Sequence, residues 1–293
     1  MDDKSEDGLP PALEPGHPLF GLGYAEPVQA RPLLRLEGEA SQAGEAVVAE
    51  EVPIAFVYNG RPHLVMMGTP ADLEDFAVGF SLTEEIVRDP GEITRLDVVR
   101  HAQGIELYLD IPDAAADRVA NRGRQLVGRT GCGLCGVESI QEAVRESRSV
   151  VPLGEIPLEA LWRAEAALPA LQRWNQETGS LHAAAWATQA GVLEVVREDV
   201  GRHNALDKVI GAIVRSGRKP VDGFLVVTSR ASYEMVQKAT VVGVRMLAAV
   251  SRPTGLAIRL AQASGLTLVA LLRGRTANVY APIPEKVIER NRK

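Results

Sequence analysis

The sequence has few of the residues that mark several large classes of protein. Two cysteines among 293 residues cannot form a disulfide scaffold, and their short spacing would constrain little of the chain. Lysine and arginine number 32 against 38 aspartates and glutamates, so a net charge of −6 gives no overall basic surface for nucleic acid. No stretch reaches the roughly 18 uninterrupted apolar residues of a membrane-spanning helix. We therefore expect a cytoplasmic protein that binds neither nucleic acid nor membrane.

Aromatic residues are also scarce, at 4% of the chain, whereas hydrophobic residues make up 46% and charged residues 24%. This balance is ordinary for a globular protein. A chain of this length buries roughly three quarters of its extended surface on folding. Aliphatic side chains and alanine are therefore expected to supply most of the core.

The N-terminus differs in composition from the rest of the chain. Six of the 18 prolines lie within residues 1–32, together with several acidic residues. An acidic, proline-rich start is the opposite of a secretory signal peptide, which is basic and then apolar. Because this composition buries little apolar surface, we predict a disordered tail over residues 1–30.

Residues 31–127 are predicted to form an N-terminal α+β region. Strands flank the dipeptide Asn59-Gly60, which suits a short hairpin over residues 54–67. Thr69 precedes a proline and is expected to cap a helix. A second strand pair is expected over residues 96–109.

Residues 151–293 alternate between helical and strand patterns. Helices are predicted over residues 158–176, 202–214, 232–247 and 255–263, and strands over residues 192–196, 224–227 and 266–272. Pro169 is expected to kink or divide the first helix. Such alternation predicts an α/β fold with a layered sheet covered by helices.

Between these regions, residues 128–150 are predicted to hold a reactive cysteine loop and the helix that follows it. Cys132 and Cys135 lie among four glycines, which let the backbone approach a partner closely. A helical pattern begins at Val137, and a thiol just before a helix meets free N–H groups that favour the thiolate. Arg129 adds positive charge nearby.

Three interpretations of the cysteine pair remain open from the residues alone. The thiols are ordinary members of a glycine-rich turn, they form half of a zinc site, or they are a reactive dithiol that exchanges disulfides or carries a persulfide. Structural zinc normally has four ligands. The remaining two would have to come from His63, His101, His182 or His203, which are widely separated in the sequence.

Polar residues also gather where strands are expected to end. Residues 198–208 contain a dense run of charged and imidazole groups, interpreted either as a site for an anion or as a solvated helix start. Within this run His203 is a candidate acid–base group. Polar side chains also follow strands at residues 228–235 and 251–254, and ligands bind at such edges of open α/β sheets.

The last predicted strand ends in two arginines around a glycine. Residues 271–276 are interpreted either as a cradle for phosphate or a guanine edge, or as a hairpin turn with exposed arginines.

Together these motifs resemble the FdhD family, the sulfur carriers required to make formate dehydrogenase active. The resemblance covers about residues 47–281. It rests on Arg129–Gly136, Thr178–Ala184, Glu198–Lys208, Ser229–Ala239 and Thr267–Tyr280.

The resemblance implies a sulfurtransferase that acts through a cysteine persulfide. Sulfur would come from a cysteine desulfurase and pass to the molybdenum or tungsten bis-guanine-dinucleotide cofactor before that cofactor enters apo-formate dehydrogenase. It implies Cys132 as the persulfide carrier and Cys135 as an assisting thiol. The part of the family that contacts the pterin guanine dinucleotide aligns with Leu271, Leu272, Arg273, Gly274, Arg275 and Thr276.

The resemblance further implies a main domain like the cytidine-deaminase fold, a homodimer, and no tightly bound metal of the protein's own. Two other functions remain as alternatives. A thiol–disulfide oxidoreductase would form a reversible Cys132–Cys135 disulfide. A non-enzymatic chaperone would bind the molybdenum cofactor and use its cysteine pair only to hold zinc.

Overall fold

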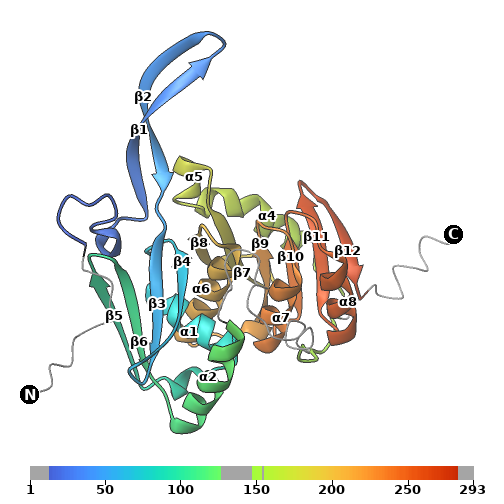
Figure 1. The fold of residues 1–293 in the computed structure, drawn as a ribbon. Coiled ribbons are helices and arrows are strands. Elements are labelled where there is room, and N and C mark those ends of the chain that lie inside the picture. The colour runs from blue at the N-terminus through green and yellow to red at the C-terminus, as the bar shows by residue number, and fades with distance from the viewer. Residues whose placement is uncertain (1–12, 127–146, 154, 283–293) are drawn as a thin grey trace, which may run out of the picture.

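The computed structural model describes residues 13–126, 147–153 and 155–282 (Figure 1). The predicted mixed α/β class is confirmed, because a two-stranded, a four-stranded and a six-stranded sheet are combined with helices. Within these residues no helix is both long enough and apolar enough to cross a membrane.

The first sheet is an antiparallel ribbon of β1 (Val28–Glu37) and β2 (Ala40–Ala49), which projects from the rest of the molecule (Figure 1). It follows a short 3-10 helix, η1 (Leu22–Tyr24). The predicted disordered tail extended to residue 30, but η1 and the start of β1 at Val28 lie within that range. Gly23 is buried, and the Tyr24 hydroxyl donates a hydrogen bond to the Arg100 carbonyl at 3.0 Å. These contacts fix a segment whose composition alone suggested a free tail.

The four-stranded sheet has the order β4-β3-β6-β5. Its strands are β3 (Val52–Tyr58), β4 (Arg61–Gly68), β5 (Arg95–His101) and β6 (Gly104–Asp110). The predicted hairpin is confirmed, and both turn residues have positive φ, 49° at Asn59 and 73° at Gly60. The second predicted strand pair, β5 and β6, is also confirmed.

Helices and a short 3-10 segment complete this N-terminal part: α1 (Leu73–Thr83), η2 (Pro90–Glu92) and α2 (Asp113–Leu126). The predicted cap at Thr69 is wrong, because α1 begins at Leu73 after Asp72. The Thr69 N–H donates instead to Asp199 Oδ2 at 3.0 Å, and its hydroxyl accepts from the Val200 N–H at 3.2 Å. Thr69 therefore joins the two halves of the chain.

The six-stranded sheet has the order β12-β11-β10-β9-β7-β8. Its strands are β7 (His182–Thr188), β8 (Leu193–Asp199), β9 (Gly223–Val227), β10 (Met246–Ala249), β11 (Thr267–Arg273) and β12 (Thr276–Ala281). The central strands β9, β10 and β11 are parallel, whereas β7 and β12 run antiparallel to their neighbours. Since β8 is antiparallel to β7, it runs in the same direction as β9.

Helices cover both faces of this sheet. They are α4 (Leu158–Leu171), α5 (Asn175–Thr178), α6 (Arg202–Arg215), α7 (Tyr233–Val241) and α8 (Gly255–Ser264), with the 3-10 segment η3 (Pro220–Asp222) before β9. The core on one sheet face includes residues of α6, α7 and α8, and the core on the other includes residues of α4.

Two of the predicted helices differ from the structure. The helix predicted over residues 232–247 ends at Val241, and Met246–Ala249 forms strand β10. Gly243 lies between them with φ of 79°, a conformation that ends a helix readily. The helix predicted over residues 158–176 is divided soon after Pro169, as the proline suggested.

The α1 and α6 helices lie against each other between the two larger sheets (Figure 1). Gly79 and Gly211 allow this close approach, because an added Cβ at either position would overlap the other helix's backbone. Beside the crossing, the Asp75 carboxylate on α1 pairs with Arg197 Nη2 at 2.8 Å and with Arg215. Small residues and a buried carboxylate thus join the two parts of the molecule.

Replacing Gly211 with alanine is expected to destabilise the protein by about 3 kcal/mol, because the new methyl group would force the two helices apart. Chemical unfolding measures the loss. Gly255→Ala is the matched control, since its Cβ would meet nothing closer than 3.6 Å. Equal stability of the two variants would contradict the backbone contact at Gly211.

Candidate functional site

The sheet topology brings polar segments together at one edge of the six-stranded sheet. The carboxyl ends of β8, β9, β10 and β11 lie at this edge, with the amino ends of β7 and β12. Helices α6, α7 and α8 begin there, so their free N–H groups and positive dipole ends face the same region. We call this region the carboxyl edge. Open α/β sheets bind ligands at such edges.

The two predicted catalytic residues, Cys132 and Cys135, lie outside the described residues, as does the helix expected after them. Their place relative to the carboxyl edge therefore stays a prediction.

Asp199, at the end of β8, is buried and holds the α6 start in place. Its carboxylate accepts hydrogen bonds from the Gly201 N–H at 2.7 Å, Asn204 Nδ2 at 3.0 Å and Lys208 Nζ at 2.6 Å. Lys208 also donates to the Thr69 carbonyl at 2.9 Å. Asp199 and Lys208 of the 198–208 segment therefore bind each other and neighbouring groups of the fold. The alternative interpretation of this segment was a solvated helix start with local ion pairs. The local pair is present between Lys208 and Asp199, but these two side chains are not solvated, because both are fully buried.

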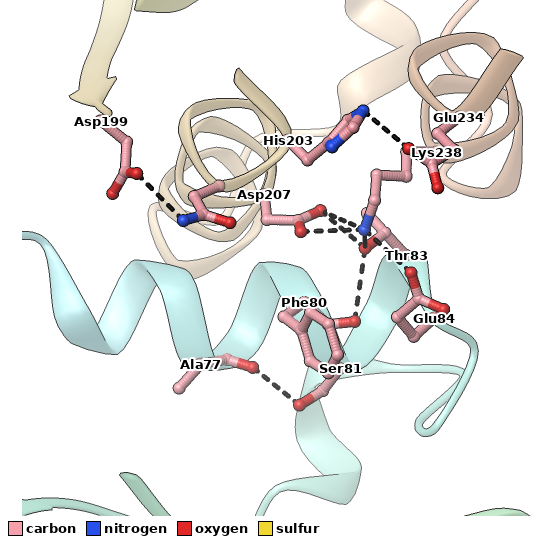
Figure 2. A network of polar contacts seen from close by, with 11 residues as sticks. Ala77, Phe80, Ser81, Thr83, Glu84, Asp199, His203, Asp207, Glu234 and Lys238 are labelled. Carbon is pink, nitrogen blue, oxygen red and sulfur yellow. Dashed lines mark hydrogen bonds and ion pairs between the residues drawn. The ribbon is translucent and has the colours of Figure 1, made fainter. Parts of the chain in front are cut away.

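A second buried charge cluster joins α6, α7 and α1 (Figure 2). Lys238 Nζ on α7 donates to Asp207 Oδ2 at 2.8 Å, to Glu84 Oε1 at 3.0 Å and to Thr83 Oγ1 at 2.9 Å. The Thr83 hydroxyl donates in turn to Asp207 Oδ1 at 2.7 Å. Burial alone would lower the pKa of Lys238, but the Asp207 and Glu84 carboxylates outweigh it and raise that pKa. The ammonium group therefore stays charged.

Neither cluster contains Glu198, whose buried carboxylate accepts hydrogen bonds from the N–H groups of Trp174 and Asn175. Arg202 and His203 lie in the first turn of α6 and also belong to neither cluster. His203 Nε2 lies 2.8 Å from Glu234 Oε2, which belongs to the first turn of α7 (Figure 2). Both side chains remain 20% exposed. Arg202 Nε and Ser232 Oγ are buried nearby, and neither has a hydrogen-bond partner in the described part of the chain. The edge therefore holds buried polar atoms that bind no other residue within the ranges 13–126, 147–153 and 155–282.

His182, at the start of β7, belongs to the same edge. Burial lowers the pKa of its imidazole, and the positive charge of Arg202 lowers that pKa further. His182 is therefore neutral at physiological pH.

The predicted cofactor-binding residues lie at the end of β11, in the turn that follows it and at the first residue of β12. Arg273, Gly274, Arg275 and Thr276 are exposed, while Leu272 packs in the core behind them. Leu271 has φ of 55°, and its N–H donates to the Ser251 carbonyl at 3.1 Å. Arg275 Nη2 lies 2.5 Å from Glu159 Oε1 on α4. The turn thus presents arginines beside the carboxyl edge, while their role in cofactor binding stays a prediction.

The histidines proposed as additional zinc ligands are spread over several places. His63 lines a cavity of about 570 Å³ beside the β3–β4 turn, and His101 pairs with Glu106 at 2.9 Å on the four-stranded sheet. His182 and His203 lie at the carboxyl edge. Among the described residues, no group of three or more His, Cys, Asp or Glu side chains is arranged to hold a metal ion.

Two residues that complete the buried cluster around Lys238, Thr83 and Glu84, were not predicted from the sequence. They lie more than 120 residues before Asp207, and nothing in their local sequence signals this partner. Glu234 was within a segment singled out by its motif, but its pairing with His203 depends on how α6 and α7 pack.

The family model and the curated relatives that match this chain all belong to one family. A model of the FdhD/NarQ family matches residues 49–288. The sulfur carrier protein FdhD of Bordetella petrii is 46% identical over 250 residues, covering 85% of this chain and 89% of the relative. The protein of the same name from Xanthomonas campestris is 47% identical over 251 residues, covering 86% and 89%.

A solved structure has the same fold. A Desulfotalea psychrophila protein, described as a formate dehydrogenase accessory protein, superposes with a TM-score of 0.66 at 23% identity. The match covers 88% of this chain and 98% of that protein. At this identity the likeness establishes the fold alone.

Proposed function

The chain belongs to the FdhD/NarQ family, and from this premise we propose that it is a sulfur carrier that works as a sulfurtransferase. The observation that carries the proposal is the extent of the match to relatives named sulfur carrier proteins, which spans most of both chains. The Cys-x-x-Cys motif at Cys132 and Cys135 lies within the matched residues.

Cys132 is the proposed carrier, and its chemistry is thiol exchange. Its thiolate attacks the outer sulfur of a persulfide on a cysteine desulfurase, and one S–S bond forms while another breaks. The desulfurase cysteine leaves as a thiolate, and the carrier keeps the sulfur as a persulfide. Cys135 assists transfer or resolves the adduct.

The proposed recipient is the molybdenum or tungsten bis-guanine-dinucleotide cofactor, which is a substrate here and passes on to apo-formate dehydrogenase. The carboxyl edge supports this assignment, because three helix N-termini and the exposed Arg273 lie along it. Diphosphates are favoured at helix N-termini and beside guanidinium groups. We also propose that the protein is located in the cytoplasm and that it forms a homodimer.

Cofactor binding is tested with guanosine diphosphate, which carries the guanine and diphosphate of the larger molecule. Arg273→Ala is expected to weaken binding about tenfold, the effect of losing one hydrogen bond to a charged group. Isothermal titration measures the affinity. Arg95→Ala removes another exposed arginine, from β5 in the four-stranded sheet, and serves as the control. Unchanged affinity in Arg273→Ala would remove this turn from the cofactor site.

A further inference from the structure

The ribbon of β1 and β2 has one apolar face. Alternate side chains of a strand share a face, and the register places even-numbered residues of β1 opposite odd-numbered residues of β2. One face therefore consists of Val28, Ala30, Pro32, Leu34, Leu36, Ser41, Ala43, Glu45, Val47 and Ala49. All of these residues except Ser41 and Glu45 are apolar. The opposite face holds the other charged side chains of the two strands, Arg31, Arg35 and Glu37.

The apolar face lies largely in solvent. Because the ribbon projects from the rest of the molecule (Figure 1), Leu34 is 62% exposed and Leu36 is 72% exposed. A two-stranded ribbon is only marginally stable in water unless something packs on it. Contiguous exposed apolar surface also marks sites where proteins bind one another. The face is therefore expected to be covered when the protein is assembled.

A second exposed apolar surface lies on the four-stranded sheet. Val65 and Met67 on β4 are 61% and 48% exposed, while the residues that alternate with them pack against the core. Their partners across the strand pair are Ala55 and Pro53 on β3, which are half-buried. We call Pro53, Ala55, Val65 and Met67 the β4 patch.

We propose that the apolar face of the ribbon packs on the β4 patch of a second copy of this chain, and that the ribbon of the second copy packs on the first in the same way. The ribbon points away from the four-stranded sheet of its own chain (Figure 1), so it meets such a patch only on another molecule. The inference rests on the homodimer of the proposed function and deepens it by naming the surface that joins the two copies.

Charge favours this pairing of surfaces. Neither surface contains a lysine or an arginine, and Glu45 is the one charged residue that they include. The contact therefore removes little charge from water, whereas burial of the opposite ribbon face would desolvate Arg31 and Arg35. A second copy brings the apolar surface that this face needs.

The size of the contact also suits a dimer. Each strand of the ribbon has ten residues, which makes a face about 34 Å long and roughly 10 Å wide. A two-fold axis makes the contact twice, so the dimer buries on the order of 1,300 Å² in total, above the roughly 1,000 Å² that a specific interface needs. One contact alone would bury about half of this, so both ribbons are required.

The test measures the dimer dissociation constant of the full chain by analytical ultracentrifugation over a dilution series. Leu34→Glu on the ribbon and Val65→Glu on the β4 patch each introduce a charge into the apolar contact, and each change occurs twice in the dimer. We expect either variant to raise the dissociation constant about a hundredfold.

Two controls place a glutamate outside the proposed contact. Arg35→Glu changes the residue next to Leu34, on the opposite face of the same strand. Val192→Glu replaces another exposed valine, 49% exposed, which precedes β8. Both are expected to dimerise like the wild type. Thermal unfolding shows whether each variant is folded, and Leu36→Glu or Met67→Glu replaces a variant that is not.

A wild-type dissociation constant in Leu34→Glu or in Val65→Glu would overturn the inference while leaving the homodimer intact. Dissociation caused by Arg35→Glu would also overturn it, because the contact would then involve the polar face. If Leu34→Glu stays dimeric but no longer takes up sulfur from a cysteine desulfurase, the ribbon binds the donor enzyme and the inference is wrong. A wild-type protein that is monomeric at every concentration would overturn both the homodimer and the inference, without affecting the sulfur-carrier function.

Discussion

Replacing Cys132 with alanine is expected to abolish the uptake of sulfur from a cysteine desulfurase. The alanine variant lacks the nucleophile, and no neighbouring hydroxyl can replace a thiolate in this exchange. The expected result for wild type is a mass increase of one sulfur atom that a reductant removes. Intact-protein mass spectrometry after incubation with desulfurase and cysteine measures it directly.

Cys135→Ala is the matched control for this experiment, because it removes the other thiol of the same motif. We expect it to retain the added sulfur. If the adduct instead persists in Cys132→Ala and disappears in Cys135→Ala, the carrier function holds and the roles of the two thiols are exchanged. If no variant gains mass, the sulfur-carrier proposal is wrong.

The same measurement separates the two alternative functions. A thiol–disulfide oxidoreductase would show a Cys132–Cys135 disulfide, with the mass of two hydrogens lost and no sulfur gained. A chaperone that holds zinc would show bound metal in native mass spectra, lost on replacement of either cysteine.

Local patterns predicted those parts of the fold that depend on neighbouring residues. The β3–β4 hairpin follows from Asn59-Gly60, whose positive φ angles suit a tight turn. The start of α6 follows from the apolar spacing after Arg202. By contrast, the ribbon of β1 and β2 was missed, because neither strand has a continuous buried face. The β1 strand mixes leucine with arginine and glutamate, and β2 is rich in alanine.

The candidate site was predictable only in part, for a physical reason. The many charged residues in the 198–208 segment were recognised from the sequence. Whether each of them is buried and paired or faces a ligand depends on partners far away in the sequence. Asp199 meets Thr69, and Asp207 meets Thr83 through contacts that only the packing of α1 on α6 creates. A charged residue that is buried and paired looks the same in sequence as one that faces a ligand. The structure distinguishes the two kinds of residue, because Asp199 and Asp207 are buried and paired whereas Arg202 and His203 lie at the carboxyl edge.

Replacing Lys238 with methionine is expected to lower the free energy of unfolding by about 3–5 kcal/mol, because it leaves Asp207 buried without its counter-ion. Methionine has a similar length and keeps the packing of the aliphatic stem. The Asp207 and Lys238 side chains are almost fully buried, so water cannot replace the lost ammonium group. Urea unfolding followed by circular dichroism gives the change in free energy.

Two further variants show whether the stability lost in Lys238→Met comes from the lost charge or from altered packing. Arg218→Met breaks an exposed pair with Glu194 and is expected to cost less than about 1 kcal/mol. The double variant Asp207→Asn with Lys238→Met removes both charges, so part of the lost stability should return. If the double variant is instead as unstable as the sum of Lys238→Met and Asp207→Asn, each measured alone, the pair is not coupled. The cluster would then stabilise the α1–α6–α7 junction through packing and neutral hydrogen bonds, and the charges of Asp207 and Lys238 would have no structural role there.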